Sequence, residues 1–169
     1  MSQTVYLSLG SNLGDREANL ARGLEMISAL EGFELIKCSS IYITKPLDMD
    51  ESAPFFLNMV IKGEFAYTPL ELLGNTQRIE RELGRTGKGA GLPRPLDIDI
   101  LLWGEEKIMT ARLTVPHPRM ADRGFVMVPL LEMEPELVDP VTGRRLAEAV
   151  EFSDAEDVIL YKECDRHYA

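Results

Sequence analysis

Two aspartates separated by one residue, Asp97 and Asp99, have the type and spacing that could bind a metal ion. The stretch from Arg94 to Leu102, Arg-Pro-Leu-Asp-Ile-Asp-Ile-Leu-Leu, leads into an apolar run and predicts a strand. Side chains alternate between the two faces of a strand, so both carboxylates would point the same way, about 7 Å apart. Such a pair favours a neutralising cation, and Mg²⁺ prefers carboxylate oxygens. The alternative is a strand end that emerges into water with two solvated aspartates.

The charge of the chain is unevenly distributed. The net charge is −10, which argues against nucleic acid as the main partner, because binding to a phosphate backbone requires clustered cations. Residues 78–123 nevertheless hold nine Lys or Arg side chains against seven Asp or Glu side chains. A locally cationic segment around an aspartate pair fits a small polyanion, and a nucleoside triphosphate is the natural candidate.

The length and composition predict one domain over residues 1–169, because 169 residues with 45% hydrophobic and 27% charged side chains can build a substantial core. No apolar run approaches the roughly 20 residues that span a bilayer, and residues 1–10 lack the pattern of a secretory leader. Cys38 and Cys164 lie far apart in the sequence, and we interpret them as reduced thiols. Together these features predict a cytoplasmic protein with no membrane partner. We also expect the protein to be a monomer.

Hydrophobic periodicity predicts the elements that must position the aspartates. The expected elements are strands at 5–9, 33–44, 55–67 and 97–103, and helices at 16–30, 68–83 and 123–132. A short hairpin should follow the strand at 97–103 and end near Leu113. The order β-α-β-β-α-β predicts an α+β fold with a ferredoxin-like core, to which the hairpin and C-terminal helices are added.

Two further segments have the composition of loops. Residues 45–54 are acidic and bounded by prolines, so we expect them to be exposed. Residues 84–95 hold four glycines, two prolines and three cations, which predicts a mobile lid with an anionic target. We expect residues 144–150 and the polar C-terminal tail to be peripheral, and Met109 to fill the core.

Seven separated motifs occur in a characteristic order along the chain. They are Gly10-Ser11-Asn12, Phe56-Leu57-Asn58, Gln77-Arg78-Ile79-Glu80, Gly84-Arg85, Pro93-Arg94-Pro95-Leu96-Asp97-Ile98-Asp99-Ile100, Leu113-Thr114-Val115-Pro116-His117 and Arg123-Gly124-Phe125. With these motifs the chain resembles the 6-hydroxymethyl-dihydropterin pyrophosphokinase family of folate biosynthesis, over roughly residues 5–150. The resemblance implies transfer of pyrophosphate from ATP to the hydroxymethyl group of the pterin, with release of AMP.

For the nucleotide, the resemblance implies a magnesium-dependent site. Asp97 and Asp99 would hold two Mg²⁺ ions that accompany ATP, and Arg85 and Arg94 match the catalytic arginines of the family's loop. Arginine can pair with phosphate through two hydrogen bonds and stabilise charge that develops on it. The nucleotide-contacting positions would be Gln77, Glu80, Lys88, Arg94, Arg112, Thr114, His117 and Arg123. For Gln77 and Glu80, which lie one helical turn apart, a solvated helix face is the alternative.

For the pterin, the resemblance implies a flat slot between two aromatic rings, Phe56 and Phe125. Asn58 lies two residues after Phe56, on the same face of a strand, and its amide suits the amide-like edge of the heterocycle. Backbone groups around Thr44, Pro46 and Leu47 would complete that edge. Each phenylalanine alone would be interpreted as core packing.

The sequence departs from the family pattern at two positions of the predicted lid. Family members often carry an arginine where this chain has Gly87 and a tryptophan where it has Leu92. Two other interpretations stay open at this point. A nucleic-acid-binding module of the same topology would need aromatic side chains on the sheet and a basic face. A pterin- or nucleotide-binding protein without catalysis would form no AMP.

Overall fold

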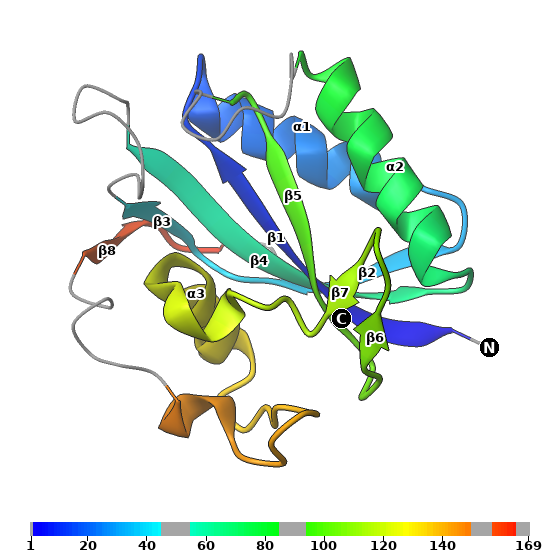
Figure 1. The fold of residues 1–169 in the computed structure, drawn as a ribbon. Coiled ribbons are helices and arrows are strands. Elements are labelled where there is room, and N and C mark those ends of the chain that lie inside the picture. Colours follow the sequence, from blue (N-terminus) through cyan, green and yellow to red (C-terminus); the bar gives the residue numbers. More distant parts are fainter. Residues whose placement is uncertain (1, 45–54, 85–93, 150–156, 165–169) are drawn as a thin grey trace.

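The structure, a computed structural model, describes residues 2–44, 55–84, 94–149 and 157–164, and it is built on a six-stranded antiparallel sheet (Figure 1). The hydrogen-bonded order is β5-β1-β4-β3-β8, and β2 also pairs with β4. The strands of this sheet are β1 (Gln3–Ser11), β2 (Phe33–Cys38), β3 (Ile41–Thr44), β4 (Phe56–Phe65), β5 (Asp97–Trp103) and β8 (Val158–Lys162).

Helices cover both faces of the sheet (Figure 1). The helices α1 (Arg16–Ser28) and α2 (Pro69–Glu82) pack on one face, and α3 (Gly124–Met133) packs on the other. Two short 3-10 helices, η1 (Met120–Asp122) and η2 (Leu146–Glu148), lie on either side of α3 in the chain. Among the described helices, none combines the length and the apolarity that crossing a membrane requires.

The starts of α1 and α2 are defined by local hydrogen bonds that the sequence encodes. The carboxylate of Asp15 accepts a hydrogen bond of 3.1 Å from the amide of Ala18. Thr68 and Glu71 form a capping box, in which each side chain accepts from the backbone amide of the other, and Pro69 occupies the first turn. The predicted helices at 16–30 and 68–83 are therefore confirmed, with ends that differ by at most two residues.

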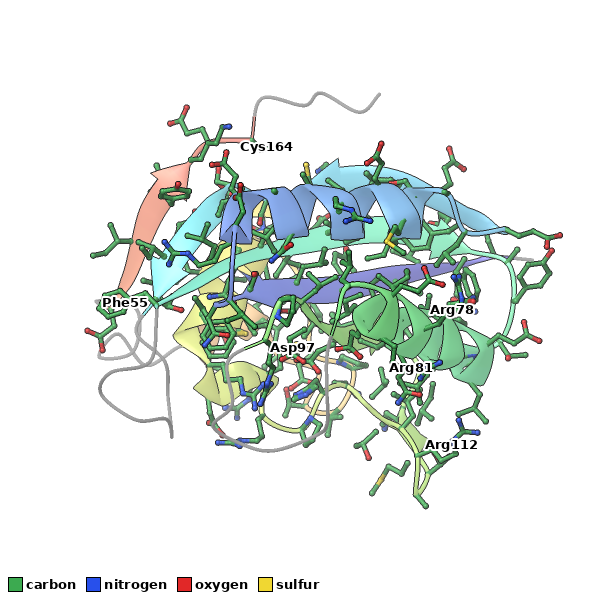
Figure 2. The ribbon with its side chains drawn as sticks, turned by 90° about the horizontal axis from the view of Figure 1, so that it is seen from above. Phe55, Arg78, Arg81, Asp97, Arg112 and Cys164 are labelled. Atoms are coloured by element: carbon green, nitrogen blue, oxygen red, sulfur yellow. The ribbon has the colours of Figure 1, made fainter. Side chains whose placement is uncertain are left out.

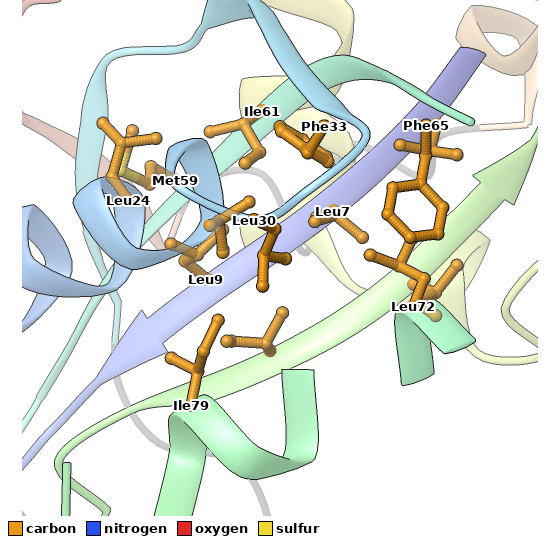
Figure 3. Packing of buried hydrophobic residues seen from close by; sticks show 14 of the residues in the cluster. Leu7, Leu9, Leu24, Leu30, Phe33, Met59, Ile61, Phe65, Leu72 and Ile79 are labelled. Carbon is orange, nitrogen blue, oxygen red and sulfur yellow. The ribbon is translucent and has the colours of Figure 1, made fainter. Parts of the chain in front are cut away.

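The larger hydrophobic core lies between the sheet and the two helices α1 and α2 (Figure 3). Leu7 and Leu9 of β1 point into it and are fully buried, as are Leu72 and Ile79 of α2. A second cluster lies between the other face of the sheet and α3, where Val60 and Leu130 are fully buried. Full burial of one such side chain contributes about 1.5–3 kcal/mol. The sheet is therefore buried on both faces and provides the rigid support on which the site residues are placed.

The single strand predicted at 33–44 is wrong in one respect, because the chain forms two strands, β2 and β3, that both pair with β4. The break falls at Ser39 and Ser40. The amide of Ser39 donates to the carbonyl of Val60 (2.8 Å), and the amide of Val60 donates to the hydroxyl of Ser39 (2.9 Å). The hydroxyl of Ser39 thus takes the place of one backbone carbonyl in the hydrogen bonding to β4. This interruption divides residues 33–44 into two strands.

Three other expectations about the periphery need correction. The predicted hairpin exists as a separate two-stranded sheet of β6 (Ile108–Met109) and β7 (Thr114–Val115). Met109 is 85% exposed on this hairpin and fills no core. Part of the polar tail forms β8, which pairs with β3 and extends the main sheet. The tail could not be assigned because this pairing joins residues more than a hundred positions apart.

Candidate active site

Asp97 and Asp99 lie on one face of β5, at the wall of a cavity of about 510 Å³. They alternate with Ile98 and Ile100, which are buried in the core on the other face. Their side chains are 22% and 33% exposed, so the fully solvated pair is wrong. The cavity is lined by Leu73, Gln77, Glu80, Arg81, Arg94, Asp97, Ile98, Asp99, His117 and Arg123.

An arginine lies next to each of the two carboxylates. The Nη1 atom of Arg94 is 3.0 Å from Oδ2 of Asp97, and Nη1 of Arg123 is 3.9 Å from Oδ2 of Asp99. The backbone of Arg94 is fixed by Asn12, which is fully buried. The amide of Arg94 donates to the Asn12 side chain (2.6 Å), and the Asn12 amide donates to the Arg94 carbonyl (3.0 Å). Asn12 therefore ties the end of β1 to the start of β5.

Helix α2 contributes one face to the cavity. Gln77, Glu80 and Arg81 are spaced three and four residues apart, and all three line the cavity. Glu80 is only 6% exposed, so the solvated helix face is wrong for this residue. Its Oε2 atom accepts a 2.9 Å hydrogen bond from the amide of Ile98 on β5, an edge strand of the sheet. Arg81 is not among the residues predicted from the sequence, although its position one turn after Gln77 is the signal that could have identified it.

His117 faces the same cavity as a neutral imidazole. Burial lowers its pKa from 6.5 to about 4, with further lowering by Arg123 and Arg119, while Asp97 acts in the opposite direction. The Nδ1 atom accepts a hydrogen bond of 3.2 Å from the amide of Arg119. The proton of the neutral ring is therefore assigned to Nε2, which can donate to an anion. The preceding Val115–Pro116 peptide bond is cis.

The predicted pterin residues lie on β4, two strands from Asp97, and on β3, three strands from it. Asn58 is 3% exposed, and its Nδ2 atom donates to the hydroxyl of Thr44 at 2.8 Å. Gly10 of β1 is the cross-strand partner of both Asn58 and Asp97, so the three residues form one row across the sheet. Glycine leaves room for these side chains in this row, because an added Cβ would lie 2.7 Å from Oδ1 of Asn58 and 3.4 Å from a ring carbon of Phe56, so that the Asn58 side chain would have to shift.

Arg123 links the carboxylate side to the aromatic side. Its guanidinium lies 5.6 Å from the centre of the Phe125 ring, in the first turn of α3, while its Nη1 atom approaches Asp99. Helix α3 packs on the β3–β4 face that carries Asn58, and Phe56 pairs with Thr44 across β3 and β4. The two phenylalanines are thus on elements that border the same face.

The structure does not bring every predicted residue to the cavity. Arg112 and Thr114 are exposed on the β6–β7 hairpin, and Figure 2 shows Arg112 well away from Asp97. Of the other sequence-based assignments, Arg85, Lys88, Pro46, Leu47, Gly87 and Leu92 lie outside the described residues.

The donors available for a metal ion at this cavity are carboxylates. Within the described ranges, no group of three or more His, Cys, Asp and Glu side chains is arranged to hold a metal. Asp97 and Asp99 offer two carboxylates toward one cavity, which is a donor set suited to a hard cation that also takes oxygen ligands from a phosphate. The residues present fit Mg²⁺ bound together with a nucleotide.

Comparisons with known proteins agree over most of the chain. A sequence model of the 7,8-dihydro-6-hydroxymethylpterin-pyrophosphokinase family matches residues 6–135. A protein of Bacillus subtilis, named 2-amino-4-hydroxy-6-hydroxymethyldihydropteridine pyrophosphokinase, is 44% identical over 133 residues, which is 79% of each chain. The Aquifex aeolicus protein of the same name is 40% identical over 145 residues, covering 86% of this chain and 89% of the other.

Solved structures share the fold at low identity. The crystal structure of wild-type Plasmodium falciparum HPPK-DHPS with pteroate aligns with a TM-score of 0.68 and 15% identity, over 88% of this chain and 42% of that one. The present chain thus spans less than half the length of that structure. The match to the family and the identity to its members, over nearly four fifths of the chain, are the decisive findings. The chain belongs to the 7,8-dihydro-6-hydroxymethylpterin-pyrophosphokinase family.

Proposed function

We propose that this chain transfers pyrophosphate from ATP to the hydroxymethyl group of 6-hydroxymethyl-7,8-dihydropterin, giving AMP and the pterin pyrophosphate for folate biosynthesis. The observation that carries this proposal is the cavity in which Asp97 and Asp99 adjoin two arginines. Membership of the pyrophosphokinase family supports the same reaction.

Asp97 and Asp99 would hold two Mg²⁺ ions, since their carboxylates face one cavity and each retains only part of its exposure to water. When bound, Mg²⁺ offsets the charge of the triphosphate and makes a coordinated hydroxyl easier to deprotonate. Arg94 and Arg123 lie where their guanidinium groups can turn from the aspartates to phosphate oxygens. His117 would donate from Nε2 without adding a charge.

The pterin would lie between Phe56 and Phe125, with its amide-like edge on Asn58. The hydrogen bond from Nδ2 of Asn58 to the hydroxyl of Thr44 fixes the orientation of the Asn58 amide. In this orientation Oδ1 of Asn58 lies over Gly10 and can accept a hydrogen bond from the pterin. Two intervals between neighbouring strands separate Asn58 from Asp97, which is about 10 Å between their backbones. The ring and the triphosphate would therefore bind side by side on one face of the sheet.

The remaining sequence-based assignments complete the proposal. Arg85 and Lys88 would contact the triphosphate, Arg112 and Thr114 the nucleotide, and Pro46 and Leu47 the pterin. The segments 45–54 and 84–95, which the sequence predicts to be an exposed loop and a lid, lie almost entirely outside the described residues.

We also propose a ferredoxin-like core, formed by β1, α1, the β2–β3 pair, β4, α2 and β5. The order β5-β1-β4, with β2 and β3 on the outer side of β4, supports this topology. The proposed protein is one domain over residues 1–169, a cytoplasmic monomer that binds ATP and the pterin and no nucleic acid.

AMP formation tests the function directly. We expect AMP only when ATP, hydroxymethyl-dihydropterin and Mg²⁺ are all present, and we expect Asp97→Ala and Asp99→Ala to lose at least about a thousandfold in turnover while keeping the circular dichroism of the fold. Glu105→Ala, an exposed acid in the turn after β5, is the matched control and should retain full activity. AMP release without the pterin, or near-normal rates in both aspartate variants, would contradict the proposal.

A further inference from the structure

The thiols of Cys38 and Cys164 lie next to each other, close to the ends of β2 and β8. Figure 2 shows Cys164 well away from Asp97 and hence from the candidate active site. Their Sγ atoms are 2.8 Å apart, although 126 positions separate them in the sequence. Cys38 is the last residue of β2, and Cys164 lies two residues after β8. Both side chains are half-buried. Their separation in the sequence predicts two reduced thiols, because no local pattern indicates that a C-terminal residue returns to the end of β2.

The backbone on both sides holds the two sulfur atoms in register. β2 pairs with β4, and its last residue is opposite Ile61. The C-terminal segment is attached through β8, whose Lys162 is opposite Ile41 on β3. The amide of Cys164 then donates to the hydroxyl of Ser40 at 3.2 Å, beside the corner that joins β2 to β3. Closing from the observed separation to a bonded one needs only about 0.8 Å of movement.

From this juxtaposition we infer that Cys38 and Cys164 form a reversible disulfide that fastens β8 and the C-terminal segment to the sheet. This inference is independent of the proposed function. Both cysteines line a small cavity of about 120 Å³, together with Leu20, Met59 and the charged residues Glu17, Lys162 and Glu163. Each cysteine also keeps part of its surface exposed, so that a small disulfide can approach the sulfur atoms.

The reaction is a thiol–disulfide exchange with a low-molecular-weight disulfide. The thiolate of one cysteine attacks a sulfur of the small disulfide, forms a mixed disulfide and releases one small thiolate. The thiolate of the other cysteine then attacks the protein sulfur of that mixed disulfide and releases the second small thiolate. The two protons of the cysteines end on the two small thiols. Two electrons leave the protein, and the small disulfide is reduced.

The bond would act on a strand at the edge of the sheet that is largely exposed. Among the described strands β8 is hydrogen-bonded to β3 alone, and Ile159, Leu160 and Tyr161 are 61%, 48% and 45% exposed. Its side-chain contacts to α1 are an exposed ion pair between Lys162 and Glu17 (2.6 Å) and a long hydrogen bond from Tyr161. β3 is also the strand whose Thr44 orients Asn58. Oxidation would therefore stiffen the sheet edge that borders the proposed pterin side.

The test uses the complete purified chain in buffers of oxidised and reduced glutathione at graded ratios. After alkylation of the remaining thiols, intact mass and peptide mapping should find an intramolecular link between Cys38 and Cys164 in oxidising buffer, and dithiothreitol should reverse it. Cys38→Ser and Cys164→Ser should each give a mixed disulfide with glutathione in place of the link. Wild-type protein whose two cysteines stay fully alkylated at the most oxidising ratio would overturn the inference.

The second readout is stability, which does not depend on catalysis. The melting temperature of the oxidised wild type should exceed that of the reduced protein by on the order of 10 °C, because a long loop is closed in the unfolded chain. The double variant Cys38→Ser/Cys164→Ser, the matched control, should melt at the same temperature in both buffers. Hydrogen exchange should slow in β8 upon oxidation. An equal change in the double variant, or no slowing in β8, would refute the fastening role.

Discussion

Glu80 stabilises the strand that carries the two aspartates, because its side chain accepts the amide of Ile98 where β5 forms the edge of the sheet. Replacing Glu80 by Ala removes that acceptor from a buried amide, so we expect a loss of about 1–3 kcal/mol in the free energy of unfolding, measured with urea. Glu80→Gln keeps a carbonyl oxygen and should lose less than half as much.

Glu82 provides the control for this prediction. It lies two residues further along α2 and forms an exposed ion pair with Arg78, with both side chains nearly half exposed. Glu82→Ala should change the free energy of unfolding by about 0.5 kcal/mol or less. If Glu80→Ala behaved like Glu82→Ala, the hydrogen bond to Ile98 would have no structural importance.

His117 predicts a dependence of stability on pH. Its pKa falls from 6.5 to about 4 on folding, mainly through burial, so the folded protein binds this proton less readily than the unfolded chain does. The stability that follows from keeping the ring neutral is fully present above pH 6.5 and is lost as the pH falls toward 4. Without Mg²⁺ or ATP, the wild type should therefore lose more stability between about pH 7.5 and about pH 5 than His117→Gln does.

Urea unfolding at the two pH values measures this difference. His167→Gln, which removes the other histidine of the chain, is the control and should follow the wild type. A proton NMR titration of the His117 ring gives the folded pKa independently. A ring that titrates near its ordinary pKa, or parallel losses in wild type and His117→Gln, would refute the assignment.

At the scale of elements, Gly10 lies at the point of β1 where this central strand pairs with Asn58 of β4 on one side and with Asp97 of β5 on the other. The methyl group of Gly10→Ala would meet Oδ1 of Asn58 at 2.7 Å and displace it, so affinity for the pterin should fall about tenfold or more. Binding of ATP should change less than about threefold, because the added atom faces Asn58 and Phe56. Isothermal calorimetry with each ligand measures both effects.

Gly74→Ala is the matched control for that substitution. Gly74 lies on the exposed side of α2, and nothing lies within 4 Å of the Cβ it would gain. The change should leave both affinities unaltered and raise helix stability by about 0.5–1 kcal/mol. Equal loss of both ligands in Gly10→Ala would indicate general misfolding and would contradict a local role.

Elements that are specified by neighbouring residues could be predicted from the sequence. The caps at Asp15 and Thr68 lie within three residues of their partners, and the shared face of Asp97 and Asp99 follows from the alternation of one strand. The division of 33–44 could not be predicted, because it depends on hydrogen bonds between Ser39 and β4. The order of the motifs indicated the family. Arg81 could have been identified only from its spacing of four residues after Gln77 on α2.

At the scale of the whole molecule, a ligand that joins α2, β5 and the segment before α3 should stabilise the entire fold. At about a hundred times its dissociation constant, Mg²⁺ with a non-hydrolysable ATP analogue should add about 2.7 kcal/mol and raise the melting temperature by about 5–10 °C. Chelation of the metal, or Asp97→Asn, should abolish most of this shift. A shift that survives chelation unchanged would exclude Asp97 and Asp99 as metal ligands.

Long-range pairings limited the prediction of the whole molecule. β8 joins β3 across more than a hundred residues, and Cys38 meets Cys164 only because of that pairing. Met109 was assigned to the core by residue type, yet the hairpin carries it into water. In each case the outcome depends on which distant segment is adjacent, and hydrophobic periodicity does not contain that information.

In the row formed by Asp97, Gly10 and Asn58, the central strand β1 sets the distance between the proposed metal ligand and the proposed pterin ligand. A single inserted or deleted residue in β1 beside this row would move Gly10 out of the row by about 3.3 Å and reverse the faces of the strand. Point substitutions can tune either half alone, whereas a change in length alters both together. Evolution of this fold should therefore tolerate length variation in its connections and forbid it within this strand.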